Sequence, residues 1–181
     1  MLPTRVSMIA GAIGEWRIER IVAIRGDALP AADRLRRVEA ESDTHAEARW
    51  ILHGVRSNER YTTQAEKQRL TSASPGLGRP GMHASLIPIR KSAAWWALAQ
   101  DERRALFEER SRHIGIGLEY LPAVARRLYH CRDLGEPFDF LTWFEFAPQD
   151  AGHFDELLAR LRDTEEWSYV DREVEVRLSP G

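Results

Sequence analysis

One histidine and one arginine are the residues of this sequence whose types and spacing best suit chemistry. His113 precedes Arg126 by thirteen positions, and aromatic residues lie on both sides of the pair, at Trp95-Trp96 and along 138–145. An imidazole can bind a haem iron, a guanidinium can bind an anion, and aromatic side chains can line the space between them. These residue types fit a haem that binds histidine on one face and an anion on the other.

Length and charge limit the class of protein. A chain of 181 residues fits one domain, or one fused pair of small repeats, with enough length for a real core. The net charge of −2, with acids and bases interleaved, gives no global attraction for nucleic acid or anionic lipid. We therefore expect no nucleic-acid and no membrane partner. An anionic substrate must be bound by a local cation.

The single cysteine, Cys131, excludes an internal disulfide and a cysteine-rich metal site. We expect it to be a small apolar core residue. The N-terminus has no long apolar segment of the kind found in a secretory leader, and no stretch approaches the length of a membrane span. The sequence predicts a cytoplasmic protein, or a periplasmic one if a leader has been removed.

The second half of the chain has the clearest pattern of predicted elements. In order these are a strand over 83–91, a helix after Ser92, a charged helix from Asp101 to about Arg112, strands over 123–131 and 138–146, a helix over 154–161 and a strand over 167–178. This order, β-α-β-β-α-β, is the ferredoxin-like unit, whose sheet is antiparallel with helices on one face.

The first half of the chain shows fewer elements of the same ferredoxin-like order, with weaker patterns. Strands are predicted over 16–24 and 50–55, with a short helix over 63–71. We predict an α+β fold in which a truncated N-terminal ferredoxin-like half, 1–82, pairs with a haem-binding ferredoxin-like half, 83–181, as in a dimeric α+β barrel.

Strand alternation separates the two adjacent arginines. Arg126 shares its face with Leu128, whereas Arg127 points the opposite way. A guanidinium on an apolar face is costly unless it meets an anion or a carboxylate. Two interpretations remain: an internal ion pair, for example with Asp139 or Glu145, or an anion-binding residue over a cofactor.

His113 has less support from its own surroundings. The sequence has six histidines but no HExxH motif or close His/Asp/Glu cluster, which argues against a zinc or non-haem iron site. The other five are expected to be exposed or structural. His113 is predicted to end the charged helix, beside small residues that let a flat group approach the backbone. Glu166 is either an exposed acid at a helix end or the acceptor behind a metal-bound imidazole.

Taken together, these residues resemble the chlorite dismutase family. The resemblance rests on Lys91, Trp95-Trp96, His113, Arg126-x-Leu128-Tyr129-His130 and Asp139-Phe140-x-Thr142-Trp143-Phe144-Glu145. It runs colinearly from about Ser85 to Leu178, and the short N-terminal region is similar to the short, dimeric lineage. The resemblance implies a homodimeric haem b enzyme that converts chlorite to chloride and dioxygen, forming the O–O bond at a ferric haem beside a distal arginine.

The resemblance also implies a role for each matching residue. His113 would be the proximal iron ligand, Glu166 would accept its other ring N–H, and Arg126 would be the distal arginine. The haem propionates would lie at Tyr61, Lys91 and Trp95. Glu173 departs from the longer, pentameric members, which carry an aromatic residue at the corresponding position.

Three alternatives share this fold. Coproheme decarboxylases rely on a tyrosine directly before a proline, where this chain has Ile87-Pro88, and they generally lack an arginine at the position of Arg126. A haem-binding or sensing protein would keep the cavity without the reaction. A haem-free α+β barrel would make His113 and Arg126 purely structural.

Overall fold

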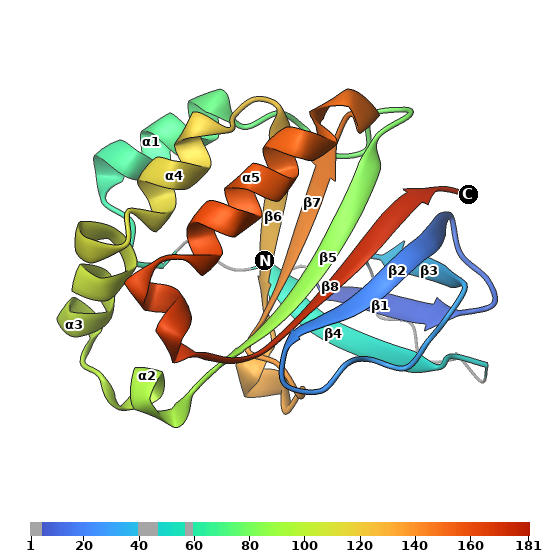
Figure 1. The fold of residues 1–181 in the computed structure, drawn as a ribbon, viewed down its shortest axis with the longest axis horizontal. Coiled ribbons are helices and arrows are strands. Elements are labelled where there is room, and N and C mark those ends of the chain that lie inside the picture. The colour runs from blue at the N-terminus through green and yellow to red at the C-terminus, as the bar shows by residue number, and fades with distance from the viewer. Residues whose placement is uncertain (1–4, 40–46, 57–59) are drawn as a thin grey trace.

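Eight strands close into one barrel, and the helices lie along one side of it (Figure 1). The computed structural model describes residues 5–39, 47–56 and 60–181. The order around the barrel is β1-β3-β2-β8-β5-β7-β6-β4, with every neighbouring pair antiparallel. The strands are β1 Arg5–Gly11, β2 Trp16–Arg25, β3 Arg34–Val38, β4 Trp50–Arg56, β5 His83–Lys91, β6 Val124–His130, β7 Phe140–Phe146 and β8 Val170–Pro180.

The helices differ in length and type. The α-helices are α1 Gln64–Ala73, α2 Ala93–Ala97, α3 Gln100–Arg104, α4 His113–Glu119 and α5 Ala151–Arg162. A π-helical segment, η1 Ala105–Arg110, follows α3, and three 3₁₀ segments are η2 Arg132–Leu134, η3 Pro148–Asp150 and η4 Glu165–Tyr169. None of the helices within the described ranges has both the length and the apolar character needed to cross a bilayer.

The C-terminal half has the predicted ferredoxin-like order. Its four strands lie side by side as β8-β5-β7-β6, with α2 to α4 between β5 and β6 in the chain and α5 between β7 and β8. Pairing of β5 with β7 runs without a shift from His83 opposite Phe146 to Ile89 opposite Phe140. The predicted α+β class with an antiparallel sheet is confirmed, and the sheet closes as a barrel.

The N-terminal half contributes β1 to β4 and α1. Its two predicted strands and its helix are present, and Thr63 begins α1 with a capping box to Glu66. Strands β1 and β3 were not predicted. The side chains of β1 are buried almost throughout, so the strand lacks polar alternation, and β3 is short and rich in arginine. Division of the chain at residue 82 stays a prediction, because all eight strands share one barrel.

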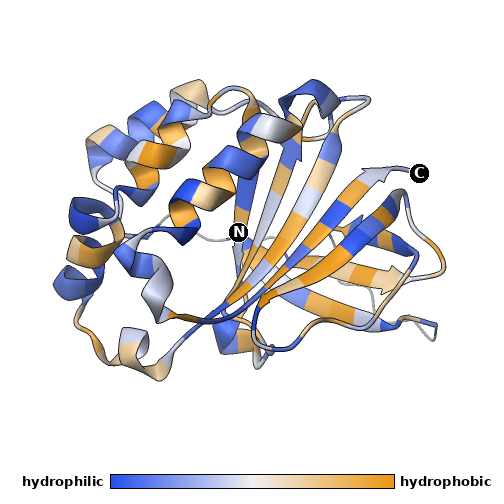
Figure 2. Cartoon of the chain, in the orientation of Figure 1, coloured by the Kyte–Doolittle hydropathy of each residue, from blue (hydrophilic) through white to orange (hydrophobic). Residues whose placement is uncertain are grey.

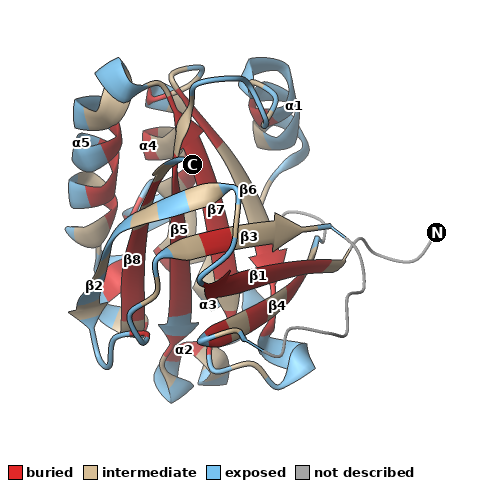
Figure 3. Cartoon of the chain, turned by 90° about the vertical axis from the view of Figure 1, so that its right-hand side faces the viewer, coloured by how far each residue is buried: buried red, intermediate tan, exposed pale blue. Residues whose placement is uncertain are grey.

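Apolar side chains form two cores, one on each face of the C-terminal sheet. Leu86, Leu141 and Trp143 pack inside the barrel, whereas Phe144 and Phe154 pack between the sheet and the helices. Figure 2 shows hydrophobic residues running along the central strands, and Figure 3 shows β5 and β8 buried while β2 is largely open to solvent. The space between sheet and helices therefore has an apolar floor.

The cysteine and the last helix match their predictions. Cys131 is a buried member of the barrel core, and burial raises the pKa of its thiol. The predicted apolar stripe of α5 is buried as a whole: Phe154, Leu157, Leu158 and Leu161.

The predicted helix over 101–112 is present as one helical stretch from Gln100 to Arg110, α-helical in α3 and π-helical in η1, but the placement of His113 at its end is wrong. The α-helix stops at Arg104, a π-helical turn follows, and Arg112 adopts a left-handed backbone with φ of 52°. His113 is instead the first residue of α4. The kink is stabilised by Glu108, whose carboxylate accepts the N–H groups of Ile114 at 2.6 Å and Gly115 at 3.1 Å. A cap that acts across a turn leaves no periodic signal in the sequence.

Candidate active site between sheet and helices

A cavity of about 540 Å³ lies between the strands β5, β7 and β6 and the helices α1, α4 and α5. Cofactor and ligand sites are commonly ~300–1,000 Å³. All six residues that the sequence singled out line it: Tyr61, Lys91, Trp95, His113, Arg126 and Glu166. The fold thus brings together residues that are spread over more than a hundred positions of the chain.

His113 is held by a buried carboxylate. Its Nδ1 lies 2.7 Å from Oε2 of Glu166, whose side chain is 3% exposed. Since a carboxylate accepts, Nδ1–H donates, and Nε2 has no hydrogen-bond partner among the described residues. Of the two interpretations of Glu166, the exposed acid is therefore wrong, and the acceptor behind an imidazole matches the geometry.

Glu166 also binds Lys91. The ammonium donates to Oε1 at 2.7 Å and lies 4.2 Å from the ring centroid of Trp95. Burial alone would raise the pKa of Glu166, but the attraction of His113 and Lys91 outweighs burial and lowers it to about 2. Glu166 is therefore ionised at neutral pH and shares its charge between an ammonium and an imidazole.

Two residues that sequence reasoning missed hold this group in place. The buried Ser111 accepts the backbone N–H of Glu166 at its hydroxyl, at 2.9 Å, and so joins η4 to the residue two positions before His113. Glu108 fixes the start of α4 as described above. Neither has a motif of its own, since each acts through a backbone group far away or beyond a kink.

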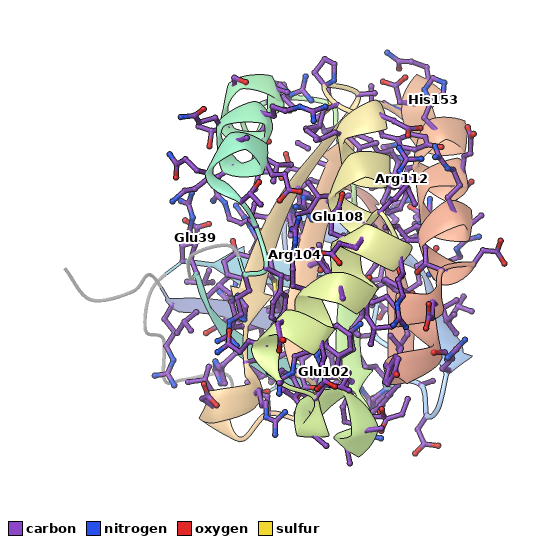
Figure 4. All side chains as sticks on the ribbon, turned by 90° about the vertical axis from the view of Figure 1, so that its left-hand side faces the viewer. Glu39, Glu102, Arg104, Glu108, Arg112 and His153 are labelled. Carbon is purple, nitrogen blue, oxygen red and sulfur yellow. The ribbon has the colours of Figure 1, made fainter. Side chains whose placement is uncertain are left out.

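An ion pair ties α1 to the same helices. Arg104 binds both carboxylate oxygens of Glu66, at 2.8 and 2.9 Å, and also donates to the backbone oxygen of Tyr61. The hydrogen bond from Arg104 lowers the pKa of Glu66 to about 2. Figure 4 looks onto this side of the molecule, where Arg104, Glu108 and Arg112 follow one another along the helical wall.

The opposite wall carries Arg126. In β6 it is paired with Phe144 of β7, and both side chains line the cavity. Arg127 binds Glu39 instead, at 2.9 Å, and so does the hydroxyl of Tyr129, at 3.1 Å. Arg127 also borders the cavity, but it is paired with Trp143 of the barrel core, so the predicted alternation of the two arginines agrees with the strand pairing.

The two carboxylates that the sequence offered as partners of Arg126 have other donors. Asp139 accepts the backbone N–H of Lys91 at 2.7 Å and the indole N–H of Trp96 at 3.1 Å. Glu145 accepts from the backbone of Gly78 at 2.6 Å and from Trp143 at 2.9 Å. Both acids therefore have structural hydrogen bonds of their own.

Aromatic side chains close the cavity near Lys91. Trp95 is 1% exposed while Trp96 is half-buried, so one of the two adjacent tryptophans lies fully in the interior. The ring of Tyr61 packs edge-on against Trp95 at a centroid distance of 6.2 Å. The indole Nε1 of Trp95 is buried and has no hydrogen-bond partner among the described residues.

The remaining histidines have structural or exposed positions. His130 is buried in β6, His53 contacts Ser7 at 3.0 Å, and His153 is exposed on α5. His45 lies outside the described residues.

The residues present fit a haem. His113 offers Nε2 as one protein ligand, and the described residues hold no group of three or more His, Cys, Asp or Glu side chains that could bind a bare metal ion. A single histidine would suffice to hold haem iron, because the porphyrin brings its own nitrogen ligands. The unpaired indole N–H of Trp95 is a donor suited to a carboxylate of such a group.

Comparison with known proteins shows which family the chain belongs to. Residues 25–180 match a family model described as chlorite dismutase. The chain belongs to the chlorite dismutase family. The match extends well before Ser85, where the recognisable resemblance began, and confirms the predicted family.

Solved structures of the family resemble the whole chain. A dimeric chlorite dismutase from Nitrobacter winogradskyi has a TM-score of 0.91 and 52% identity, covering 96% of this chain and 99% of that one. A chlorite dismutase from Candidatus Nitrospira defluvii, solved with imidazole, has a TM-score of 0.69 and 23% identity, over 99% and 93% of the two chains, which shows a shared fold.

A curated relative is similar over a shorter segment. The chlorite dismutase of Ideonella dechloratans is 36% identical over 86 residues, which make up 48% of this chain and 28% of that relative. The residue before Pro88, Ile87, lines the cavity and is 1% exposed.

Proposed function

We propose that this protein is a haem b enzyme that converts chlorite to chloride and dioxygen. The observation that carries the proposal is one cavity with His113 on its helical wall and Arg126 on its strand wall, in a chain of the chlorite dismutase family. The reaction balances without a second substrate, since ClO₂⁻ contains both oxygen atoms of O₂ and leaves Cl⁻.

His113 would hold the iron through Nε2. Its Nδ1–H donates to Glu166, whose full negative charge makes the imidazole a stronger electron donor. Lys91 keeps Glu166 ionised inside the protein. When bound, the haem would supply an iron centre able to exchange an oxygen atom and electrons with the oxyanion.

Arg126 would bind and retain the anion. Its neighbours along the strand wall, Leu128, Phe144 and Ile87, are apolar and exclude water, so a guanidinium there attracts an anion more strongly than in solution. By holding the anion in the cavity, Arg126 would keep both oxygen atoms of chlorite together until O₂ is released.

Tyr61, Lys91 and Trp95 are proposed to contact the haem propionates. Trp95 has the best support, because its indole N–H is unpaired. The ammonium of Lys91 already binds Glu166, so we assign it first to that carboxylate. Its contact with a propionate stays a prediction.

A homodimer in the cytoplasm completes the proposal. The relative from Nitrobacter winogradskyi is described as dimeric, and it matches nearly the whole chain. Light scattering after size-exclusion chromatography should give twice the mass of 20.8 kDa; a monomer or a pentamer would contradict the dimer.

An oxygen electrode tests the reaction. We expect haem-loaded protein to release O₂ rapidly after chlorite is added, and Arg126→Ala to release it slowly with earlier bleaching of the haem. Haem binding without O₂ release would support the binding or sensing alternative. Absence of a Soret band after reconstitution would support the haem-free barrel.

A further inference from the structure

Two aromatic rings stack against the imidazole of His113. The ring centroid of Phe107, in η1, lies 4.4 Å from that of His113, and the two planes make an angle of 23°. Trp167, in η4, stacks at 6.1 Å and also at 23°. Together with the hydrogen bond to Glu166, these contacts define both the position and the plane of the imidazole.

Trp167 is in turn held by a buried carboxylate. Its indole N–H donates to Oε2 of Glu173 at 2.7 Å, and Glu173 is fully buried. The other oxygen, Oε1, accepts from Arg162 of α5 at 2.9 Å, and the closest approach of the two groups is 2.7 Å. Both oxygens of Glu173 are therefore engaged, one by the indole and one by a guanidinium.

Glu173 does more than form an ion pair between α5 and β8, as its position shows. Its neighbour Glu175 already binds Arg162 at 2.9 Å, and also binds Arg20 and Arg177. Glu173 lines the cavity, whereas Glu175 does not. A carboxylate buried at this point, beside an apolar core, is expensive unless it is fully bonded. The hydrogen bond from the indole N–H of Trp167 gives a reason for a carboxylate at position 173.

We infer that Glu173 is a positioning residue that sets the plane of the His113 imidazole through Trp167. The inference rests on the proposed function in one respect, since the plane matters because His113 would bind iron. A fixed plane would give the bond between Nε2 and the iron one orientation relative to the porphyrin. Phe107 completes the clamp from the neighbouring segment.

Glu173→Leu removes the acceptor, Glu173→Gln keeps an oxygen acceptor without the charge, and Trp167→Phe keeps an aromatic ring without the N–H. Glu175→Leu is the matched control, because it removes a carboxylate from the same strand and the same arginine but leaves Trp167 bonded.

The first measurement needs no haem. In NMR spectra of the apoprotein, the indole N–H of Trp167 should resonate downfield and exchange slowly, and the ring protons of His113 should show the shifts caused by stacked aromatic rings. Glu173→Leu should move both sets of signals, whereas Glu173→Gln and Glu175→Leu should leave them near the wild-type positions. If Glu173→Leu does not fold, Trp167→Phe should still shift the His113 signals.

The second measurement uses haem-loaded protein. In electron paramagnetic resonance spectra of the cyanide-bound ferric form, Glu173→Leu should shift or broaden the g-values, with Glu173→Gln and Glu175→Leu like wild type. Unchanged His113 signals and unchanged g-values in Glu173→Leu would overturn the inference, as would an equal change in Glu175→Leu. If wild type binds no haem, the proposed function fails, and the apoprotein spectra alone decide the positioning role.

Discussion

The two walls of the cavity are built in different ways. The strand wall consists of β5, β7 and β6, whose cavity-facing side chains are apolar apart from a few groups such as Arg126. The helical wall is held by the polar contacts of Glu166, which binds Ser111 and His113 and also reaches Lys91 at the end of β5. Backbone pairing fixes the first wall, and side-chain hydrogen bonds fix the second.

This difference separates recognition from ligation. An anion is bound most strongly where little water competes for its cationic partner, as beside the apolar side chains of the strand wall. A metal ligand needs a fixed direction and a defined tautomer, which the helical wall supplies through Glu166. Removing Glu166 should therefore cost stability above all, and removing Arg126 should cost reaction rate above all.

The largest expected effect is on stability, in Glu166→Ala. This change leaves the ammonium of Lys91 buried without its carboxylate, and breaking a buried pair from one side costs ~3–5 kcal/mol. Urea unfolding should show this loss. The neighbouring Glu165→Ala removes an ion pair with Arg110 whose side chains are 49% and 59% exposed, and should cost no more than ~1 kcal/mol. Equal losses of unfolding free energy in the two variants would show that the buried contacts of Glu166 stabilise the protein no more than an exposed ion pair does.

On the strand wall, Arg126→Ala should lower the rate of O₂ release by ~10²–10³, the usual effect of removing one electrostatic donor from a closed site. Arg127→Ala is the control, since this residue binds Glu39 on the other face of β6. Oxygen-electrode rates for the two variants test whether Arg126, rather than Arg127, binds the anion. A similar rate of O₂ release in both variants would contradict this assignment.

His130 gives the strand wall a dependence on pH. Burial, then repulsion by Arg60, lower its pKa from 6.5 to about 4, with Asp133 partly opposing. Between these values the unfolded chain binds a proton that the folded protein does not. Stability should therefore fall as pH drops from 6.5 to 4, by at most about 3 kcal/mol. In His130→Phe this slope should flatten, whereas the exposed His153→Phe should keep it, as measured by urea unfolding across that range.

The smallest effect is expected for Glu108→Ala. Loss of a helix cap costs ~1 kcal/mol, and here the cap holds the first turn of α4. Thermal unfolding should detect it, with the exposed Glu109→Ala as the control. Glu108→Gln, which keeps an oxygen acceptor, should recover part of the loss. A stability equal to wild type in Glu108→Ala would show that the kink before His113 is held by other contacts.

The same contrast explains what the sequence could predict. Period-two alternation in β6 distinguished Arg126 from Arg127, because strand faces depend on local geometry. The stripe of α5 was equally readable. The start of a new helix at His113 was not, since the break at Arg112 depends on Glu108 reaching across the turn. Strand β1 escaped notice because it is buried on both faces.

The role of Glu166 could be narrowed from the sequence but decided only from the structure. Its residue type permits either an exposed helix end or a buried acceptor, and nothing nearby in the sequence decides between them. The decision comes from Lys91 and Ser111, which are 75 and 55 positions away. Contacts over such separations become visible only when the barrel brings β5, the segment before α4 and η4 together.

Haem titration of the apoprotein, followed by visible spectroscopy, tests the central claim most directly. The account predicts a saturable Soret band with one haem per chain in wild type, its loss or a strong shift in His113→Ala, and a normal band in His130→Ala, a histidine that lines the same cavity. A spectrum of His113→Ala identical to wild type would contradict the assignment of His113 as the iron ligand.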